Sequence, residues 1–234
     1  MQLLIGVGAV ILGYILGSIP FGLLIVKLKT GKDLRTVESG RTGGTNAARA
    51  AGLGAGLLTA LTDILKGAIA VWLVKAFDPT NDLIHILAPI GAILGHNYSI
   101  FLVERDENGK LKFRGGAGGA TALGGAMGLW LPMFPIVFTI GALIWFTIGI
   151  ASVTTLAVGL CVIIVFAVRA SIGILPWTYI WYGVVAELLL IWALRPNIQK
   201  LLAGNERVIS MSLAGRLKAK REQRATETSK GNKP

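Results

Sequence analysis

The sequence predicts an all-α integral membrane protein with about seven transmembrane helices, an outside N-terminus and a cytoplasmic C-terminus. Apolar residues fill 53% of its 234 positions and charged residues only 15%, which is unusual for a soluble domain. The charged residues stand between long apolar segments, and basic residues are concentrated in some of the loops that separate them. A segment of about 20 mainly apolar residues is long enough to span a bilayer. These observations together predict a protein that crosses the membrane several times.

Three spans are expected in the first half of the chain, at residues 3–26, 53–74 and 84–103. No Lys or Arg precedes Lys27, so the first segment lacks the basic region with which a signal peptide begins. We therefore expect it to be a retained span.

Short loops rich in Lys and Arg face the cytoplasm. Residues 27–49 carry six basic side chains and residues 104–114 carry four, whereas residues 75–82 carry one. The first two segments are predicted to be cytoplasmic and the third to be outside. Residues 207–234 hold eight basic side chains, which places the C-terminus in the cytoplasm.

The apolar second half of the chain must contain an even number of crossings, because both of its ends are predicted to be cytoplasmic. Residues 175–194 supply one crossing. The 54 residues between Arg114 and Arg169 contain no Asp, Glu, Lys or Arg and are too long for one span. They are expected to form three short spans at 120–132, 136–150 and 153–168, with breaks at Pro132, Pro135 and around Ser152.

The chain is expected to have two parts, a membrane domain at residues 1–208 and a basic cytoplasmic tail at 209–234. The tail is polar and poor in aromatic residues, which is typical of an amphipathic or disordered extension at a membrane surface. The formal charge of the whole chain is +11. Because the basic residues are not interleaved with aromatic ones, an anionic membrane surface and anionic substrates are favoured over nucleic acid as partners. The single cysteine, Cys161, excludes an intramolecular disulfide framework.

The first polar, Gly-rich stretch is ESGRTGGTNAARAAG at residues 38–52. Its glycines allow backbone N–H groups to turn toward an anion, and Arg41 and Arg49 add positive charge. Ser39, Thr42, Thr45 and Asn46 contribute hydroxyl and amide groups. The stretch is favoured as a phosphate cradle over its alternative, a flexible basic connector between helices.

The second stretch combines GHNYSIFL at residues 95–102 with RGGAGGATALGG at residues 114–125. His96 can act as a general base near neutral pH, although a lone histidine at a helix end is more often structural. The glycine run can present several backbone donors before a helix, but Gly-rich helix packing produces the same string. It lacks the Lys and Ser/Thr arrangement of a P-loop.

Two further polar groups are ambiguous when they are considered alone. Residues 195–208, RPNIQKLLAGNERV, either line the mouth of a site or form a solvated helix cap and surface turn, with the second slightly favoured. Asp63 and Lys66 lie three residues apart at membrane depth and share a helix face. A structural ion pair is the favoured interpretation of these two residues, and polar support of a site is the alternative.

Taken together, these motifs resemble the acyl-phosphate:glycerol-3-phosphate acyltransferase (PlsY) family of bacterial membrane enzymes. The resemblance covers nearly the whole chain in order. It rests on these segments: YILGSIPFG at 14–22, DLR at 33–35, SGRTGGTNAARAAG at 39–52, DILKG at 63–67, GHNYSIFL at 95–102, GGAGGAT at 115–121 and NIQKLLAGNE at 197–206.

The resemblance implies a multi-pass enzyme of the bacterial inner (cytoplasmic) membrane with its site facing the cytoplasm. The implied reaction transfers a fatty acyl group from acyl phosphate to the 1-hydroxyl of glycerol 3-phosphate, giving lysophosphatidic acid and phosphate in phospholipid biosynthesis. No metal or other cofactor is implied. Membrane lipids and a soluble or peripheral enzyme that produces acyl phosphate are the expected partners.

The resemblance also nominates site residues. We expect direct attack by the glycerol hydroxyl without an acyl-enzyme, because acyl phosphate already carries a good leaving group. His96 is expected to bind phosphate or assist deprotonation, Ser39 and Arg49 to hold a phosphate, and Asn197 and Glu206 to orient the glycerol hydroxyls. The remaining candidates for substrate and phosphate binding are Arg41, Asn46, Arg114, Gly115, Gly116, Gly118, Gly119 and Ser152.

Three departures from the family pattern stand out. Ala117 occupies the position of the family's GGKG lysine, Arg41 occupies that of its SGN asparagine, and about ten residues around VERDENGKLK are inserted before the glycine run. Arg41, Lys112 or Arg114 are expected to restore the missing charge, because guanidinium is a good bidentate partner for phosphate. A homologue with another acyl donor or acceptor is the main alternative. A small-anion transporter comes next, and a purely structural membrane protein is the least favoured.

Overall fold

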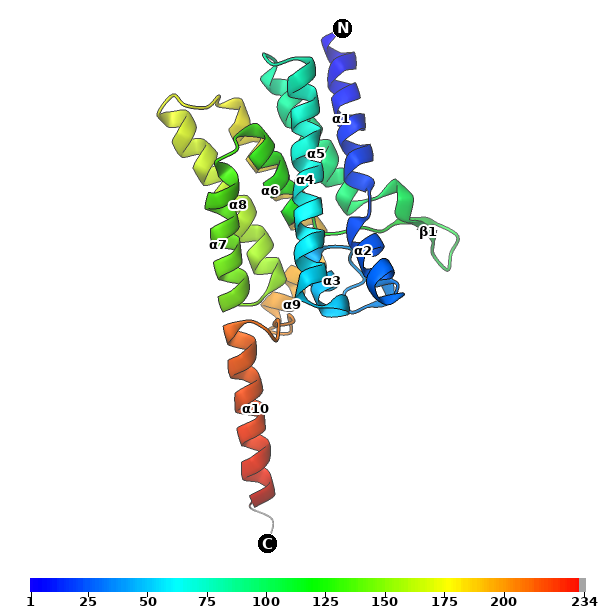
Figure 1. The fold of residues 1–234 in the computed structure, drawn as a ribbon, viewed down its shortest axis with the longest axis vertical. Coiled ribbons are helices and arrows are strands. Elements are labelled where there is room, and N and C mark those ends of the chain that lie inside the picture. Colours follow the sequence, from blue (N-terminus) through cyan, green and yellow to red (C-terminus); the bar gives the residue numbers. More distant parts are fainter. Residues whose placement is uncertain (232–234) are drawn as a thin grey trace.

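The computed structural model describes residues 1–231 of the chain, and side chains up to Arg224. The described part is a bundle of helices with one small hairpin (Figure 1). Its elements follow in the order α1 (Gln2–Ser18), α2 (Phe21–Thr30), η1 (Leu34–Thr36), α3 (Gly44–Ala51), α4 (Leu53–Phe77), α5 (Asp82–Asn97), η2 (Ile100–Leu102), β1 (Val103–Arg105), β2 (Leu111–Phe113), α6 (Gly119–Leu129), α7 (Met133–Thr147), α8 (Ala151–Ser171), α9 (Thr178–Leu202) and α10 (Leu213–Gly231).

Five segments in the described residues are long and apolar enough to cross a membrane, with α1 and α2 counted together as the first. The other four are α4, α5 with η2, α8 and α9. The segments expected at 120–132 and 136–150 form α6, of 11 residues, and α7, of 15 residues. At about 1.5 Å per residue both are shorter than a hydrocarbon core of about 30 Å. The membrane-helical class is confirmed, and the count of seven spans stays a prediction.

The first expected span, residues 3–26, is interrupted between α1 and α2 at Ile19 and Pro20. Proline has no N–H group to continue the hydrogen-bond ladder of a helix. At the break, the Ile19 carbonyl accepts bonds from the Phe21 N–H at 3.0 Å and from Lys66 Nζ at 3.2 Å. The interruption thus supplies a backbone acceptor in the bundle interior.

Glycine allows the helices to pack at backbone distance. A Cβ atom on Gly13 of α1 would collide with the Ala88 carbonyl of α5, and one on Gly124 of α6 would collide with the Ile64 carbonyl of α4. Small residues at helix contacts are a general feature of membrane bundles, since they let the backbones approach closely. Much of the glycine excess therefore serves helix packing rather than anion binding.

The main hydrophobic core lies among α4, α5, α6, α7, α8 and α9. Phe166 of α8 packs edge-on against Tyr179 and Tyr182 of α9, with ring centroids 5.7 and 6.4 Å away. The buried Tyr182 hydroxyl donates to the Ala122 carbonyl of α6 at 2.7 Å. These contacts hold α6, with the glycine run at its start, against the two long helices.

Two features of the loops and the tail go beyond what was expected. Residues 103–113, expected as a loop, form a short antiparallel hairpin. The tail forms a helix, α10, that leaves the bundle at the end opposite α1 (Figure 1). Before it, Ile209 and Ser212 are buried, and the Ile209 N–H donates to Gly149 O at 2.7 Å. The base of the tail is therefore anchored to the turn between α7 and α8.

Candidate active site

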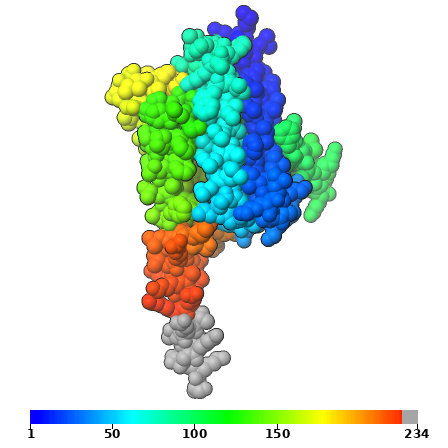
Figure 2. Space-filling view, in the orientation of Figure 1, coloured from blue at the N-terminus to red at the C-terminus, as the bar shows by residue number. Residues whose placement is uncertain are grey.

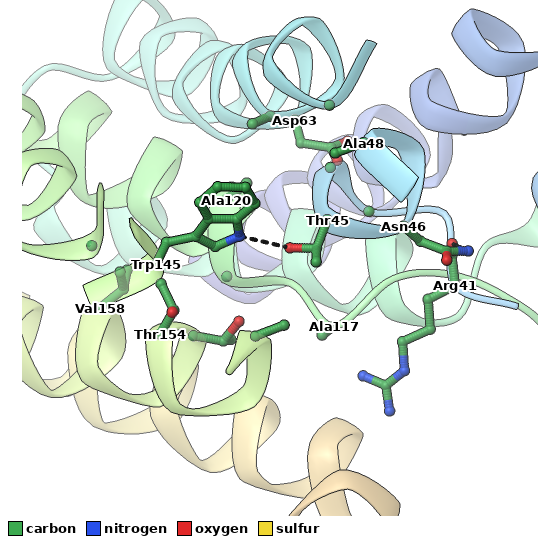
Figure 3. Close-up of a pocket in the computed structure, with 18 of the residues that line it drawn as sticks. Arg41, Thr45, Asn46, Ala48, Asp63, Ala117, Ala120, Trp145, Thr154 and Val158 are labelled. Atoms are coloured by element: carbon green, nitrogen blue, oxygen red, sulfur yellow. Dashed lines mark hydrogen bonds between the residues drawn. The ribbon is translucent and has the colours of Figure 1, made fainter. Parts of the chain in front are cut away.

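A cavity of about 280 Å³ opens near the end of the bundle from which α10 leaves. Residues from α3, α4, α5, α7, α8, α9 and the loop before α6 line it (Figure 3). It gathers the three polar stretches that are far apart in the sequence. The predicted site residues in its lining are Ser39, Arg41, Asn46, Arg49, His96, Gly118, Gly119, Ser152, Asn197 and Glu206.

Asn46 organises the loop that carries the first stretch. Its side-chain Nδ2 donates to the carbonyls of Leu34, Val37 and Arg41 at 3.3, 3.0 and 2.9 Å. These bonds tie residues 34–41 to the start of α3. The amide N–H groups of Asn46 are thus used within the loop, and its predicted phosphate contact would have to come from another atom.

Arg41 extends from this loop toward α9, on the side of the cavity where Ala117 lies (Figure 3). Its Nη2 donates to the Ala193 carbonyl at 2.7 Å. Its buried Nη1 has no hydrogen-bond partner in the described part of the chain. Burial lowers the pKa of the guanidinium below its ordinary value, and the nearby Glu206 carboxylate opposes that shift. Arginine stays charged even so, which leaves a cationic donor for an incoming anion.

Arg49 lies in the last turn of α3 and also lines the cavity. Burial lowers the pKa of its guanidinium below the ordinary value, while Glu38 acts in the opposite direction. Ser39 is exposed at the cavity mouth. The first stretch therefore places two arginines and one hydroxyl around the same opening.

His96 belongs to a buried cluster with Asp63 and Lys66 of α4. Lys66 Nζ lies 2.8 Å from Asp63 Oδ1 and 2.8 Å from His96 Nδ1. Together with Ile19 O, these atoms accept all three N–H bonds of the ammonium. The predicted ion pair is present, and it also contacts the candidate catalytic histidine. The two interpretations of Asp63 and Lys66 given above therefore both apply.

This contact determines which ring nitrogen of His96 carries the proton. An ammonium can only donate, so Nδ1 must accept and Nε2 must hold the hydrogen. Nε2 points at Gly116, where an added Cβ would collide with it. His96 therefore presents an N–H donor at the glycine run rather than a free basic nitrogen.

The glycine run shapes the start of α6. Gly118 has a left-handed backbone (φ +91°) that favours glycine, and the helix begins at Gly119. The first N–H groups of a helix have no partner within it and carry partial positive charge. Because Ala117, Gly118 and Gly119 line the cavity, these donors lie at its wall.

The third stretch is divided between the site and the surface. α9 continues through Pro196 to Leu202, so Asn197 lies inside the helix. Its Nδ2 donates to Glu206 Oε1 at 2.8 Å. The second carboxylate oxygen of Glu206 is buried without a partner among the described residues. Asn197 and Glu206 thus line the cavity, while Ala203 and Gly204 form an exposed turn, so each of the two expected arrangements describes part of the stretch.

Apolar residues extend the cavity away from these charges. Trp145 of α7 crosses to α3, where its Nε1 donates to Thr45 Oγ1 at 3.4 Å (Figure 3). Ser152 of α8 is fully buried beside the cavity, and its hydroxyl has no partner in residues 1–231. The groove is formed by α4, α7 and α8, from Leu53, Leu57, Phe138, Ala142, Trp145, Phe146 and Val158. Thr45 belongs to the predicted first stretch, whereas Trp145 was not predicted, because an apolar run gives no signal of which side chain faces a site.

Three predicted site residues lie outside the cavity lining. Arg114 Nε donates to Glu104 Oε2 at 2.9 Å. This ion pair holds the guanidinium outside the cavity lining. Gly115 and Gly116 pack against the backbone and ring of His96. Lys112 is exposed on β2. Of the three cations expected to replace the missing lysine, Arg41 alone lines the cavity.

No cluster of three or more His, Cys, Asp or Glu residues that could hold a metal ion occurs in the described residues. Cys161 lies in α8 outside the cavity lining. The ionisable side chains that line the cavity are Arg41, Arg49, His96, Asp63 and Glu206.

Comparison with known proteins agrees with this arrangement. The model of the glycerol-3-phosphate acyltransferase family matches residues 7–204. Proteins of that name from Synechococcus sp. (strain CC9902) and Rubrobacter xylanophilus are 36% and 35% identical to the chain. These alignments cover 83% and 85% of this chain, and 90% and 92% of the relatives.

Two crystal structures of PlsY, an integral membrane glycerol 3-phosphate acyltransferase, are also similar. The glycerol 3-phosphate form has a TM-score of 0.71 at 32% identity, covering 87% of this chain and 95% of that one. The lysophosphatidic acid form has a TM-score of 0.67 at 30% identity, covering 88% and 96%.

Proposed function

Because the chain belongs to the glycerol-3-phosphate acyltransferase family, we propose that it transfers a fatty acyl group from acyl phosphate to glycerol 3-phosphate. The 1-hydroxyl is acylated, and the products are lysophosphatidic acid and phosphate. One observation supports this most directly: a single cavity joins partly buried arginines to an apolar groove between helices. Such a cavity matches substrates that combine phosphate with a hydrocarbon chain.

The reaction needs no covalent enzyme intermediate. The glycerol hydroxyl oxygen bonds to the acyl carbon, the bond from that carbon to the phosphate oxygen breaks, and the hydroxyl proton passes to the departing phosphate. The mixed anhydride is already reactive, so positioning two anions and stabilising the carbonyl oxygen supply most of the catalysis.

His96 acts in this scheme as a donor to phosphate and not as the base. Lys66 occupies Nδ1 at 2.8 Å, which leaves Nε2–H to face the glycine run. Of the two roles expected for His96, this contact supports phosphate binding rather than deprotonation. The N–H groups that open α6 at Gly118 and Gly119 complete the donor set.

Arg41 replaces the charge of the lysine that the family has at Ala117. Its unpartnered Nη1 and its burial support this role, and a buried charged donor binds phosphate more strongly than a solvated one. Ser39 and Arg49 hold the same phosphate from the mouth of the cavity, and Ser152 contributes a buried hydroxyl from α8. The Asn197–Glu206 pair orients the glycerol hydroxyls.

The acyl chain lies in the groove of α4, α7 and α8. Large apolar residues at membrane depth remain exposed on these helices, which supports sideways entry from the bilayer. A soluble or peripheral enzyme that makes acyl phosphate would deliver the donor at this face.

Seven membrane crossings, an outside N-terminus and an inner-membrane location with the site toward the cytoplasm complete the proposal. The basic segments 27–49 and 104–114 and the base of α10 lie toward the cavity end of the bundle (Figure 1). Basic loops of this kind are cytoplasmic in membrane proteins. The family match to residues 7–204 supports a catalytic domain at 1–208 and a separate tail at 209–234.

The decisive experiment supplies purified protein in lipid nanodiscs with glycerol 3-phosphate and one of three donors: palmitoyl phosphate, palmitoyl-CoA or palmitoyl acyl carrier protein. Mass spectrometry measures lysophosphatidic acid. Product from palmitoyl phosphate, lost in His96→Ala, is expected. Product only from a thioester donor would establish the alternative, a homologue with a changed donor. Uptake of glycerol 3-phosphate into sealed vesicles without ester formation would indicate a transporter.

A further inference from the structure

The inserted hairpin, residues 103–113, has two chemically different faces. Val103 pairs with Phe113, Glu104 with Lys112, and Arg105 with Leu111. Directly opposite residues in an antiparallel pair share a face, and successive residues alternate. Val103, Leu111 and Phe113 therefore share one face with Arg105, while Glu104 and Lys112 occupy the other.

Ion pairs fix the orientation of the polar face. Glu104 Oε1 accepts from Arg35 Nη1 at 2.7 Å, and Oε2 accepts from Arg114 Nε at 2.9 Å. Arg35 lies in η1 and is itself held by Asp33 at 2.6 Å. The polar face is thus turned toward the loop between α2 and α3, and the apolar face is turned away from that loop.

The apolar face is exposed in the described structure. The exposed fractions of Val103, Leu111 and Phe113 are 37%, 60% and 42%, and those of the adjacent Ile100 and Phe101 are 53% and 59%. Together these five residues form the hairpin patch. A group of large apolar side chains exposed to water is unfavourable and usually marks a contact surface.

The position of the patch indicates what covers it. The hairpin projects sideways from the bundle beside the junction of α1 and α2, and Figure 2 shows it standing clear of the helices. The surface of α1 is lined by exposed apolar residues, among them Ile11 and Ile15, as a surface in lipid is. The patch therefore lies next to surface that faces the bilayer.

Basic side chains surround the patch. Lys110 at the turn and Lys112 on the polar face are exposed, as is Arg105 at the outer end of the apolar face. Long basic side chains can bury their stems while their charged ends reach phosphate headgroups. Juxtamembrane basic groups are attracted to anionic lipid.

We propose that the hairpin is a membrane-interface anchor that docks on anionic lipid. Its patch enters the boundary between headgroups and acyl chains, and Arg105 and Lys110 contact the headgroup phosphates. The Glu104 ion pairs hold it at the angle that directs the patch toward the bilayer. The anchor keeps the loop that leads into the glycine run at a constant depth beside the membrane.

Fluorescent labels on adjacent strand residues test this directly. Leu111→Cys and Lys112→Cys, each in a Cys161→Ala background, carry an environment-sensitive nitrobenzoxadiazole label in nanodiscs that contain phosphatidylglycerol. The Leu111 label should emit at shorter wavelength and be quenched by nitroxide-bearing lipid but not by aqueous iodide. The Lys112 label, on the opposite face, should emit at longer wavelength and be quenched by aqueous iodide but not by nitroxide-bearing lipid.

Other outcomes would overturn the proposal. Equal iodide quenching at both positions would mean that the patch is in water. Protection of the Leu111 label from both quenchers, lost when each nanodisc holds one molecule, would mean that a second copy covers it.

A charge test completes the experiment. In nanodiscs of neutral lipid, or in the double variant R105Q/K110Q, iodide quenching at Leu111 should increase, and an unchanged value would exclude the role given to anionic lipid. Lysophosphatidic acid synthesis by the labelled proteins verifies that they are folded.

Discussion

Two basic, Gly-containing loops lie at the site end of the molecule, and their arginines make different contacts. Arg41, in residues 38–52, turns into the cavity and keeps a buried N–H without a partner in the described structure. Arg114, ahead of the glycine run, turns outward to Glu104 at 2.9 Å. Both had been candidates for the same phosphate. Of these two arginines, the one that pairs with a carboxylate lies outside the cavity lining, and the one with an unpartnered N–H lines the cavity.

The largest effect should come from the donor that faces the glycine run. His96→Ala should lower kcat/KM about 100-fold or more, the usual cost of removing one preorganised donor. His85→Gln is the matched control, since His85 lies near the other end of the same helix and bonds to Asp78 O. Kinetics with palmitoyl phosphate measure both variants, and equal losses in the two would contradict the assignment.

The next largest effect should come from Asp63 and Lys66, which hold His96 in place. Lys66→Met leaves the Asp63 carboxylate buried and unpaired, which should cost about 3–5 kcal/mol of unfolding free energy. The double variant Asp63→Asn/Lys66→Met removes both charges and should fold. Its kcat should fall more than its KM rises, because His96 is no longer held with Nε2 protonated.

Nitrogen-15 spectra of histidine-labelled protein distinguish positioning from packing in these variants. The wild type should show His96 protonated at Nε2, with the signal assigned by its loss in His96→Gln. The double variant should show a mixture of tautomers. An unchanged tautomer together with reduced kcat would mean that Lys66 acts in some other way.

The two arginines themselves give the direct test of the comparison. Arg41→Ala should raise the KM for glycerol 3-phosphate or for acyl phosphate roughly 10- to 100-fold, the value of a hydrogen bond to a charged group. Arg114→Ala should change either KM by less than about threefold, as expected for an exposed ion pair. Ala117→Lys in the Arg41→Ala background should recover part of the loss. If both arginine variants keep the wild-type KM values, Arg41 does not replace the lysine.

The smallest effect is expected from the ion pairs that Arg35 makes with Asp33 and Glu104. The Arg35 guanidinium lowers the pKa of Asp33 from 3.8 to about 2. A carboxyl with a lowered folded pKa stabilises above its unfolded pKa, and this stability is lost as the pH falls from about 4 toward 2. Because both side chains are about one-third exposed, the effect should be no more than about 1 kcal/mol. Asp33→Asn should remove it, as thermal unfolding at pH 6 and pH 3 will measure.

Much of the fold could be predicted because its signals are local. Apolar runs, prolines and basic loops predicted most of the long helices within a few residues, although α9 extends to Leu202, beyond the expected end at 194. Glycine and hydroxyl groups marked the three stretches that contribute to the cavity. Asn197 and Glu206 were harder to assign, because a polar helix end has the same composition whether it meets water or a substrate. The hairpin at 103–113 was not predicted, since short exposed strands leave almost no periodicity to detect.

Hydropathy and motif order, which are properties of the chain alone, were enough to predict a membrane helical protein, its family and most of the polar residues around its cavity. Which charges are free and which are paired depended on the tertiary structure. It turned Arg41 inward and Arg114 outward, and it joined Lys66 to His96 across two helices. A pairing of this kind depends on distances of about 3 Å between residues that lie tens of positions apart, and no local pattern encodes such a distance.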